Sequence, residues 1–565
     1  MIRVATASGL KAQVFNLSFV ILGFAAAVWP IAGSANDFCP NIYRAGTLPV
    51  NFNPAFTHID SFNMPNGSKV DGLVVTSFYN AIKNPDGVGG AVDYFERDLV
   101  ARISGIGYRW PAWWNKDRDV EILSDVDKTD PTLPTDFDQT VWPNEAQRVP
   151  DGILPFEAVV VPEGFHTPVP PGRLTLINLD DPARSTYIID QSLQNPAGGR
   201  CKFPDHDKYD PTNAPRFYHL VKWFDMDGDG LKDVVTVRSG FKVNVLFCAP
   251  SAGEVVWFKN PGGAIDPAVE WEEHVVAGYP SARYSADISL DIADLEGDGV
   301  PEIVGGNFFT GELISLYGAP VGESWTDVDL ETNPARIAQI SDDQGAPFSV
   351  RFVDLNQDGK LDILATNHQG DDCFSATAEP IPGRVYALEQ PASGDLFGAP
   401  WATHILKDNI RPNPTFPEPA GGPGRLAPGL AQEMWPSPFY EAVNNKPWVL
   451  VGGDEASKVW LLKPDSESPT DWSYSSAVIF DINDYYGANA SQSFSAPAPA
   501  TGVSISTIGG VSWKYDRDWA WNSFAEIYIP VFEGRDIHRI TFRNKGDTNK
   551  VACPTDGAIA CPVTP

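Results

Sequence analysis

Basic residues are scarce in this sequence. Lysine and arginine together number 41, against 73 aspartates and glutamates, which gives a formal net charge of -32 over 565 residues. Negative charge on this scale repels the phosphates of nucleic acids and the anionic surfaces of membranes. We therefore expect no nucleic-acid partner, and we expect a soluble chain that commits some of its carboxylates to metal.

The motifs of several enzyme classes are also missing. The chain contains no Gly-x-Ser-x-Gly elbow, no His-Glu-x-x-His zinc motif, no phosphate-binding loop and no dinucleotide fingerprint. Each of these motifs supplies a nucleophile, a metal ligand or a backbone cradle to its chemistry. Without them, the sequence assigns no catalytic residue.

Long apolar runs occur only near the N-terminus. Arg3 and Lys11 flank the start of a mostly apolar segment, residues 14–32, and the small residues 33–35 follow it. This order is typical of a secretory signal peptide over residues 1–35, with an uncleaved signal anchor as the alternative. We expect a secreted, monomeric protein with no membrane span beyond this segment.

Cysteine is rare, with six residues in the chain. All six follow residue 35, and an even number in a secreted protein indicates disulfide bonds, although many pairings are open. We favour a bond between Cys553 and Cys561, within a C-terminal tail of residues 546–565. A bond between Cys201 and Cys248 is plausible because these residues bracket one repeat.

An acidic loop occurs three times, over residues 225–233, 294–302 and 354–362. Oxygen-bearing side chains stand at loop positions one, three, five and nine, a glycine stands at position six, and a β-rich run follows. The residue at position seven would contribute its backbone carbonyl. The candidate metal ligands are Asp225, Asp227, Asp229, Leu231 and Asp233; Asp294, Glu296, Asp298, Val300 and Glu302; and Asp354, Asn356, Asp358, Lys360 and Asp362.

Oxygen ligands at this spacing suit a hard cation. Ca2+ accepts about six to eight oxygen atoms in flexible geometry, and the glycine permits the sharp turn around the ion. Zinc and magnesium fit less well, since the set contains no His or Cys and its oxygens suit a larger ion. We predict about three structural Ca2+ sites, the third weakened by the neutral Asn356. Acidic turns that bind nothing are the alternative.

The loops belong to a longer repeat. Pairs of β-rich runs recur seven times along residues 36–545, which predicts an all-β, seven-bladed β-propeller with four strands in each blade. The last repeat lacks a fourth strand, so we expect a strand within residues 41–52 to complete that blade and close the ring. Several repeats contain a strand that begins at a tryptophan; these residues are Trp271, Trp325, Trp401 and Trp472.

These features resemble the FG-GAP/VCBS repeat family, whose propellers include the head of integrin alpha chains. The resemblance is carried by the three Asp-x-[Asp/Glu/Asn]-x-Asp-Gly-x-x-[Asp/Glu] loops, by Trp257–Gly263 and by the strand Trp271–His274, all within residues 219–406. It implies that each loop joins the first and second strands of a blade and binds Ca2+ structurally. Because that family ranges from adhesion receptors to lyases, the resemblance indicates fold and metal rather than activity.

Side chains for a ligand site or an active site are expected on the rim opposite the acidic loops, around the channel mouth. Converging His, Asp, Glu and Arg groups would supply acid–base chemistry or a second metal site. The alternative is a set of ordinary polar loop tips around a solvated channel. The candidates are Tyr79, Asn80, His166, Arg238, Asn307, His368, Asp371, Asp372, Asp454 and Glu455.

Aromatic clusters at residues 108–114, 435–440 and 513–521 suit sugar stacking or a protein-binding hot spot, or else packing between blades. We expect hydrogen-bonded core or blade-edge roles for three histidines, His219, His274 and His404. Two functions remain open. One is a Ca2+-binding scaffold for an extracellular protein or glycan; the other is an extracellular carbohydrate-active enzyme, of the lyase or dehydratase type, with its site at the channel mouth.

Overall fold

The computed structural model describes residues 41–543 of the chain, apart from internal gaps. The gaps are 51, 64–66, 78–96, 107–118, 128–142, 165–171, 192–215, 241–251, 264, 268, 279–284, 309–312, 343, 369–381, 399, 413–426, 488–507, 516–524 and 533. Contacts divide the chain into Met1–Phe38 and Cys39–Pro565, and the described residues all belong to the second unit. The expected signal segment, the six cysteines with their expected disulfides, and the tail of residues 546–565 lie outside the described residues.

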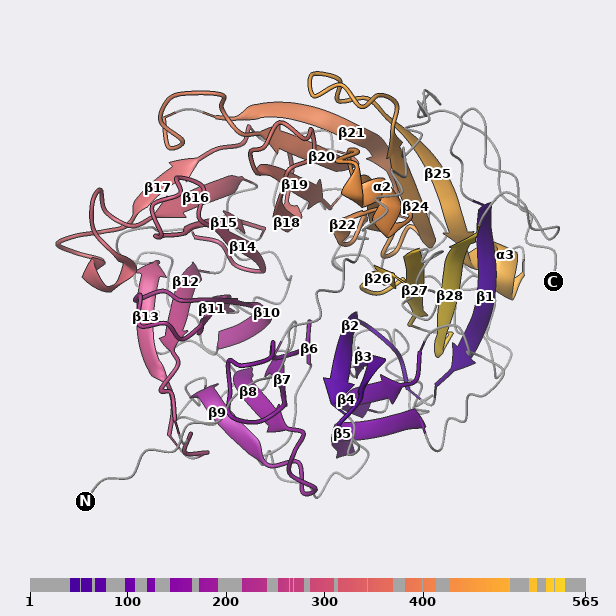
Figure 1. Cartoon of the computed structure of the whole chain (residues 1–565), viewed down its shortest axis with the longest axis horizontal. Helices are drawn as coiled ribbons and strands as arrows, with labels where there is room; N and C mark the ends of the chain where they lie inside the picture. Colours follow the sequence, from indigo (N-terminus) through magenta and orange to yellow (C-terminus); the bar gives the residue numbers. More distant parts are fainter. Residues whose placement is uncertain are drawn as a thin grey trace, which may run out of the picture. The chain divides into compact units, whose positions relative to one another are not determined.

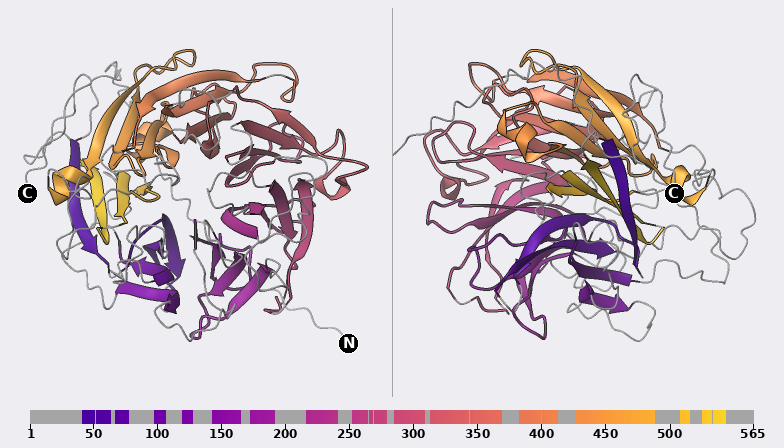
Figure 2. Two further views of the ribbon diagram at one scale, coloured as in Figure 1. Left: turned by 180° about the vertical axis from the view of Figure 1, so that it is seen from behind. Right: turned by 45° about the vertical axis from the view of Figure 1, so that its right-hand side comes forward.

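The fold is all-β, with seven antiparallel four-stranded sheets that follow one another around a central axis as the blades of a propeller (Figure 1). The view from behind shows the same ring of blades (Figure 2, left). In blades 1 to 6, four consecutive strands run from the axis outward, so the first strand of each blade faces the channel.

The strand bounds of each blade are as follows. Blade 1 contains β2 (Thr57–Asn63), β3 (Lys69–Ser77), β4 (Arg97–Ser104) and β5 (Val120–Asp127). Blade 2 contains β6 (Gln147–Arg148), β7 (Ala158–Pro162), β8 (Arg173–Asn178) and β9 (Thr186–Gln191). Blade 3 contains β10 (Arg216–Phe224), β11 (Asp233–Gly240), β12 (Ala252–Lys259) and β13 (Glu272–Ala277). Blade 4 contains β14 (Ser289–Ala293), β15 (Glu302–Gly306), β16 (Ile314–Gly318) and β17 (Arg336–Gln339).

The remaining blades follow the same order. Blade 5 contains β18 (Pro347–Val353), β19 (Asp362–Asn367), β20 (Gly383–Glu389) and β21 (Ala402–Ile410). Blade 6 contains β22 (Ala431–Met434), β23 (Trp448–Gly452), β24 (Lys458–Pro464) and β25 (Tyr474–Asp481). Blade 7 contains β26 (Ser512–Tyr515), β27 (Ala525–Val531), β28 (Asp536–Arg543) and β1 (Asn41–Pro49). The short helices are η5 (Trp325–Asp327), α2 (Pro438–Ala442) and α3 (Ile482–Tyr486).

The middle strands of the blades form the core. Every residue of β7, β15, β16, β23 and β27 is buried, whereas the peripheral β17 keeps exposed positions. Both faces of a middle strand are covered by the neighbouring blades, which explains why these strands are continuous apolar runs rather than alternating ones. One apolar cluster joins Leu220 and Val235 of blade 3 to Ile303 and Tyr317 of blade 4.

The N-terminal strand closes the ring, as the sequence predicts. β1 pairs antiparallel with β28, with Asn41 opposite Arg543 and Pro49 opposite Asp536. Leu48 of β1 is fully buried. Blade 7 therefore consists of three C-terminal strands and one N-terminal strand, and β1 covers the outer edge of β28.

The tryptophan-led strands are only partly as predicted. In blades 3, 5 and 6 the peripheral strand begins one or two residues after Trp271, Trp401 and Trp472. Trp325 instead opens the 3-10 helix η5, because Ser324 and Asp327 form a reciprocal cap and the Trp325 indole donates to the carbonyl of Pro301 over 2.9 Å. The peripheral strand of blade 4 follows later, as β17. In blade 1, β3 pairs with β4.

Candidate functional site

The three acidic loops occupy equivalent places in consecutive blades. Each loop joins the innermost strand of its blade to the second strand: β10 to β11, β14 to β15, and β18 to β19. The chain therefore turns in the same way at residues 225–233, 294–302 and 354–362. This is the placement that the family resemblance implies.

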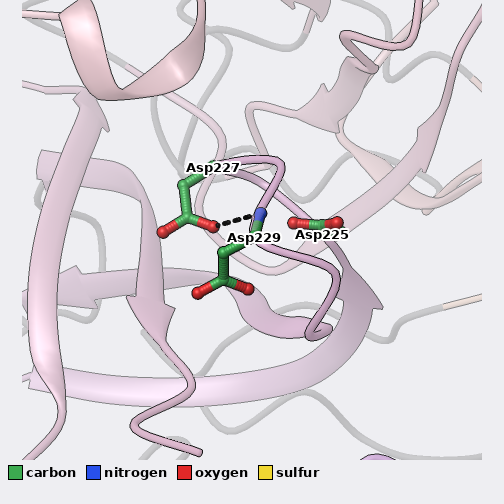
Figure 3. A group of neighbouring side chains, drawn as sticks. All are labelled: Asp225, Asp227 and Asp229. Atoms are coloured by element: carbon green, nitrogen blue, oxygen red, sulfur yellow. Dashed lines mark hydrogen bonds between the residues drawn. The ribbon is translucent and has the colours of Figure 1, made fainter.

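The first loop gathers three carboxylates on one side of a tight turn (Figure 3). The carboxylate of Asp225 accepts hydrogen bonds from the amides of Gly228 (2.8 Å) and Gly230 (2.9 Å). Both glycines have positive φ, 74° and 88°, so a side chain at either position would strain the turn. One oxygen from each of Asp225, Asp227 and Asp229 lies within 4.8 Å of the others. Among the described residues, no other group of three His, Cys, Asp or Glu side chains is this compact.

The acid at position nine is buried at the start of the second strand, where it holds the loop by hydrogen bonds. Asp233 is fully buried, and its carboxylate accepts the amides of Met226 and Asn260, each over 2.8 Å. Glu302 accepts the amide of Leu295 and Asp362 that of Leu355, so the same bond recurs in all three loops.

Burial governs the ionisation of these three acids. Desolvation raises the pKa of Asp233 to about 6, and those of Glu302 and Asp362 to about 7, although the backbone hydrogen bonds oppose it. Neighbouring carboxylates of the same loop raise the pKa further in each case. A bound cation would offset this accumulated negative charge.

The second and third loops share the turn but differ in their side chains. Asp294 and Asp354 each accept the amide of the glycine at loop position six, over 2.9 and 3.0 Å. Glu296 of the second loop lies 3.2 Å from the guanidinium of Arg336, which draws this ligand candidate toward a neighbouring cation. In the third loop, the Asn356 side chain accepts the amide of Asp358 over 2.9 Å and is almost fully buried.

A lysine already contacts the first loop. The Lys259 ammonium, at the end of β12, donates to Asp227 and lies 2.9 Å from a carboxylate oxygen of Asp229. These two carboxylates hold the pKa of Lys259 above its ordinary value, so the amine is charged at neutral pH. The carboxylates at positions three and five therefore attract cations in this conformation, and a metal ion would compete with Lys259 for them.

Two candidates for the opposite rim, Arg238 and Asn307, have buried side chains that contact neighbouring strands. Arg238 is 1% exposed; its Nε lies 2.8 Å from Glu254, and its two Nη atoms contact Glu273 at 2.7 Å each. Asn307 is also buried, and its amide donates weakly to Ser315 over 3.5 Å. Neither side chain is the solvent-exposed loop tip that the sequence suggests.

His368 and Asp454 do come together. The His368 ring lies 3.8 Å from the Asp454 carboxylate, stacks on Phe348 at 3.9 Å and meets the edge of Phe308 at 5.2 Å. His368 is 1% exposed, so these phenyl rings cover it. Glu455 follows Asp454 in the turn between β23 and β24 and is partly buried. The remaining candidates of this rim lie outside the described residues; they are His166, Asp371, Asp372, Tyr79 and Asn80.

The three histidines for which a core or blade-edge role is predicted do have such roles, and His404 also has the expected hydrogen bond, with Glu389 over 2.7 Å. His274 stacks on Trp257 and His404 on Trp472, with ring centroids 3.9 and 4.3 Å apart. His219 is buried, and its Nδ1 lies 3.3 Å from Glu145.

Packing between blades is also the role of the described aromatic clusters. Trp435, Trp513 and Tyr515 are partly buried against the apolar core of blades 6 and 7. The indole of Trp513, in blade 7, donates to the carbonyl of Glu433 in blade 6 over 2.8 Å. These rings join blades and do not form an open platform for stacking.

A cavity of about 190 Å³ lies on the axis of the ring, where the first strands of all seven blades meet. Sequence reasoning missed this cavity, because its wall takes two or three residues from each of seven distant segments. Its wall contains four ionisable side chains, and its lining residues are Phe56, Thr57, His58, Glu145, Ala146, Gln147, Leu220, Val221, Lys222, Ser289, Leu290, Ser349, Val350, Arg351, Leu430, Ala431, Gln432, Val511 and Ser512.

Ion pairs across blade boundaries fix the cations of this cavity. Lys222 of blade 3 lies 3.0 Å from Asp291 of blade 4. Arg351 of blade 5 lies 3.3 Å from Glu433 of blade 6. Burial lowers the pKa of His58 to about 4, and the two cations lower it further while Glu145 opposes them, so the imidazole is neutral at pH 7.

Comparison with known proteins gives little further information. No protein-family model matches the chain, and no curated protein matches it. Among solved structures, that of Cellvibrio cellulosa alpha-L-arabinanase complexed with arabinohexaose is similar over 60% of this chain and 96% of its own, at 13% identity and a TM-score of 0.28. Within the described residues, no helix is long and apolar enough to cross a bilayer.

Proposed function

We propose that this protein is a secreted propeller of the FG-GAP/VCBS type, stabilised by Ca2+, that acts as a binding scaffold for an extracellular protein or glycan. One observation carries the calcium part. Three consecutive blades repeat one turn in which a carboxylate at position one holds the loop amides and an acid at position nine is buried beneath them. Three such loops in register would be an improbable by-product of surface acidity.

The donor set fits the ion. In the first loop, Asp225, Asp227 and Asp229 would supply side-chain oxygens and Leu231 its carbonyl, with Asp233 closing the site from the strand. All of these are oxygen atoms, as Ca2+ prefers. Bound Ca2+ would neutralise the loop and tie the first strand of a blade to the second, which is a structural role.

Calcium titration of the purified chain tests this assignment. We expect about three sites by isothermal titration calorimetry, and each would stabilise the fold by about 2.7 kcal/mol at a hundredfold excess of Ca2+ over Kd. Asp229→Ala should remove one site and lower the melting temperature in Ca2+. Asp395→Ala is the matched control, because Asp395 caps an exposed acidic turn outside the three loops. An unchanged melting temperature after addition of EGTA would contradict the proposal.

The scaffold part is supported by the architecture around the axis. Polar groups from all seven blades meet in one cavity, and they are held in place by contacts between blades rather than by mobile loop tips. Pre-organised groups of this kind favour binding, because little ordering remains to be done when a ligand arrives. Screens of the secreted chain against a glycan array and against extracellular protein fractions would identify the ligand, and failure in both would argue against a binding role.

A further inference from the structure

The central cavity combines paired charges with apolar walls. The Lys222 ammonium has three N–H donors and shares one contact with Asp291, so it retains donors for a ligand. Arg351 contacts Glu433 through Nε and Nη2, at 3.3 and 3.5 Å, and its five donors likewise exceed its partners.

The matching acceptors are held as firmly. The second oxygen of Asp291 accepts the amide of Phe352 over 2.9 Å, which fixes the carboxylate between blades 4 and 5. The Gln432 side-chain amide, in blade 6, donates to the carbonyl of Val511, which directly precedes β26 of blade 7, over 2.7 Å. Donors at fixed positions, each paired with a carboxylate or carbonyl of the next blade, therefore surround one small space.

The charge balance argues against an ionic ligand. The two lining cations are paired, Lys222 with Asp291 and Arg351 with Glu433, and these two carboxylates are not part of the lining. Glu145 is the carboxylate of the lining, and His58 is neutral at pH 7. An anion would have to compete with Asp291 and Glu433 for the paired cations, and a cation would be repelled by Lys222 and Arg351. A group whose atoms both donate and accept hydrogen bonds fits such a wall best, and hydroxyl groups have this property.

The volume of the cavity and its apolar lining further limit which ligands fit. The cavity of about 190 Å³ is smaller than the sites of drug-sized ligands, so it suits one ring rather than a chain of rings. Between the polar groups the wall is apolar, formed by Phe56, Leu220, Val221, Leu290, Val350 and Leu430. A molecule with hydroxyls at its edge and C–H groups on its faces matches this division.

We infer that the central cavity binds one uncharged sugar ring, either as a free monosaccharide or as the terminal residue of a glycan. The inference rests on the binding function proposed above and names its ligand class. The sugar hydroxyls would contact Arg351, Lys222 and Glu145, and its C–H faces would lie against the apolar wall.

Ligand-observed NMR with free neutral hexoses and pentoses, uronic acids and amino sugars tests the inference on the full chain in Ca2+. We expect saturable binding of a neutral sugar, with uronic acids and amino sugars at least tenfold weaker. Arg351→Gln should weaken binding about tenfold or more, since a lost hydrogen bond to a charged group costs about 1.5–3 kcal/mol. Arg384→Gln is the control, because Arg384 makes a comparable ion pair, 3.0 Å from Asp408, away from the cavity.

A second Arg351 variant and a glycan array complete the test. If Arg351→Gln does not fold, Arg351→Lys keeps a charge for Glu433 but loses the planar fork, and it should still weaken binding several-fold. A glycan array distinguishes the two sources, since internal sugars and capped termini should fail if only a terminal residue enters. Glycan binding that survives both Arg351 variants would overturn the inference and leave the scaffold role intact. So would a protein ligand without sugar binding, or a preference for charged sugars.

Discussion

Acidification offers a quantitative test of the environment around His58. Its pKa is about 4 in the folded protein, against an ordinary value of 6.5, mainly because burial disfavours the charged ring. Between these values the unfolded chain takes up a proton that the folded chain does not. The free energy of unfolding contributed by His58 therefore rises with pH from about 4 to about 6.5, and it is lost as the pH falls through this window.

The size of the effect follows from the two pKa values. Proton linkage gives a loss of about 2 kcal/mol between pH 7 and pH 5. Water in the cavity screens a half-buried ring, so we expect about 1–2 kcal/mol. His58→Gln removes the titrating group and keeps a polar side chain of similar reach.

Urea unfolding at pH 5 and pH 7, in saturating Ca2+, measures the difference. Several carboxylates, Asp233 among them, have raised pKa values and give the opposite slope, so the stability of the wild type alone is ambiguous. The difference between wild type and His58→Gln isolates the histidine. An equal pH dependence in the two proteins would refute the reasoning, and so would a wild type that gains stability relative to the variant on acidification.

Three further predictions concern the closure, the first loop and a buried arginine. Deletion of residues 36–52 should abolish cooperative thermal unfolding measured by circular dichroism, and Leu48→Ala alone should cost about 2–5 kcal/mol; an unchanged melting curve would exclude closure by β1. Lys259→Met should tighten Ca2+ binding at the first loop several-fold in calorimetry, because the competing ammonium is gone, and an unchanged or weaker affinity would count against this competition. Arg238→Ala should lower the free energy of unfolding in urea by about 3–5 kcal/mol, because it breaks a buried ion pair with Glu254. A decrease below about 1 kcal/mol would mean that this ion pair does not stabilise the fold.

The sequence predicts those parts of the fold that depend on local spacing. The acidic loops can be recognised in the sequence, because their turn needs particular residue types at fixed positions within a stretch of nine. The seven repeats follow from apolar runs whose order is kept, and the strand supplied by the N-terminus follows from counting the strands of the last blade. Each of these inferences uses neighbours in the chain or a simple requirement of ring closure.

Features built from distant residues escape such reasoning. The axial cavity depends on the register of seven inner strands, so nothing near His58 in the sequence indicates that Lys222 and Arg351 are its neighbours. In the sequence Arg238 follows the β-rich run of residues 234–237, as a rim residue would, yet it lies within β11 and pairs there with glutamates of β12 and β13. The sequence predicts a strand that begins at Trp325. The structure has the helix η5 there, because Ser324 caps its first turn.

The closure by β1 also has a consequence for how the chain is made. Thr47 and His538, which contact each other across β1 and β28, are 491 residues apart in the sequence. At about 5–20 residues per second, the ribosome needs on the order of 25–100 s to deliver the second after the first. During that time β1 is an unpaired strand whose partner does not yet exist. In a crowded population of nascent chains, the β1 of one molecule can pair with the β28 of another, so dilution should favour the closed monomer over strand-exchanged dimers.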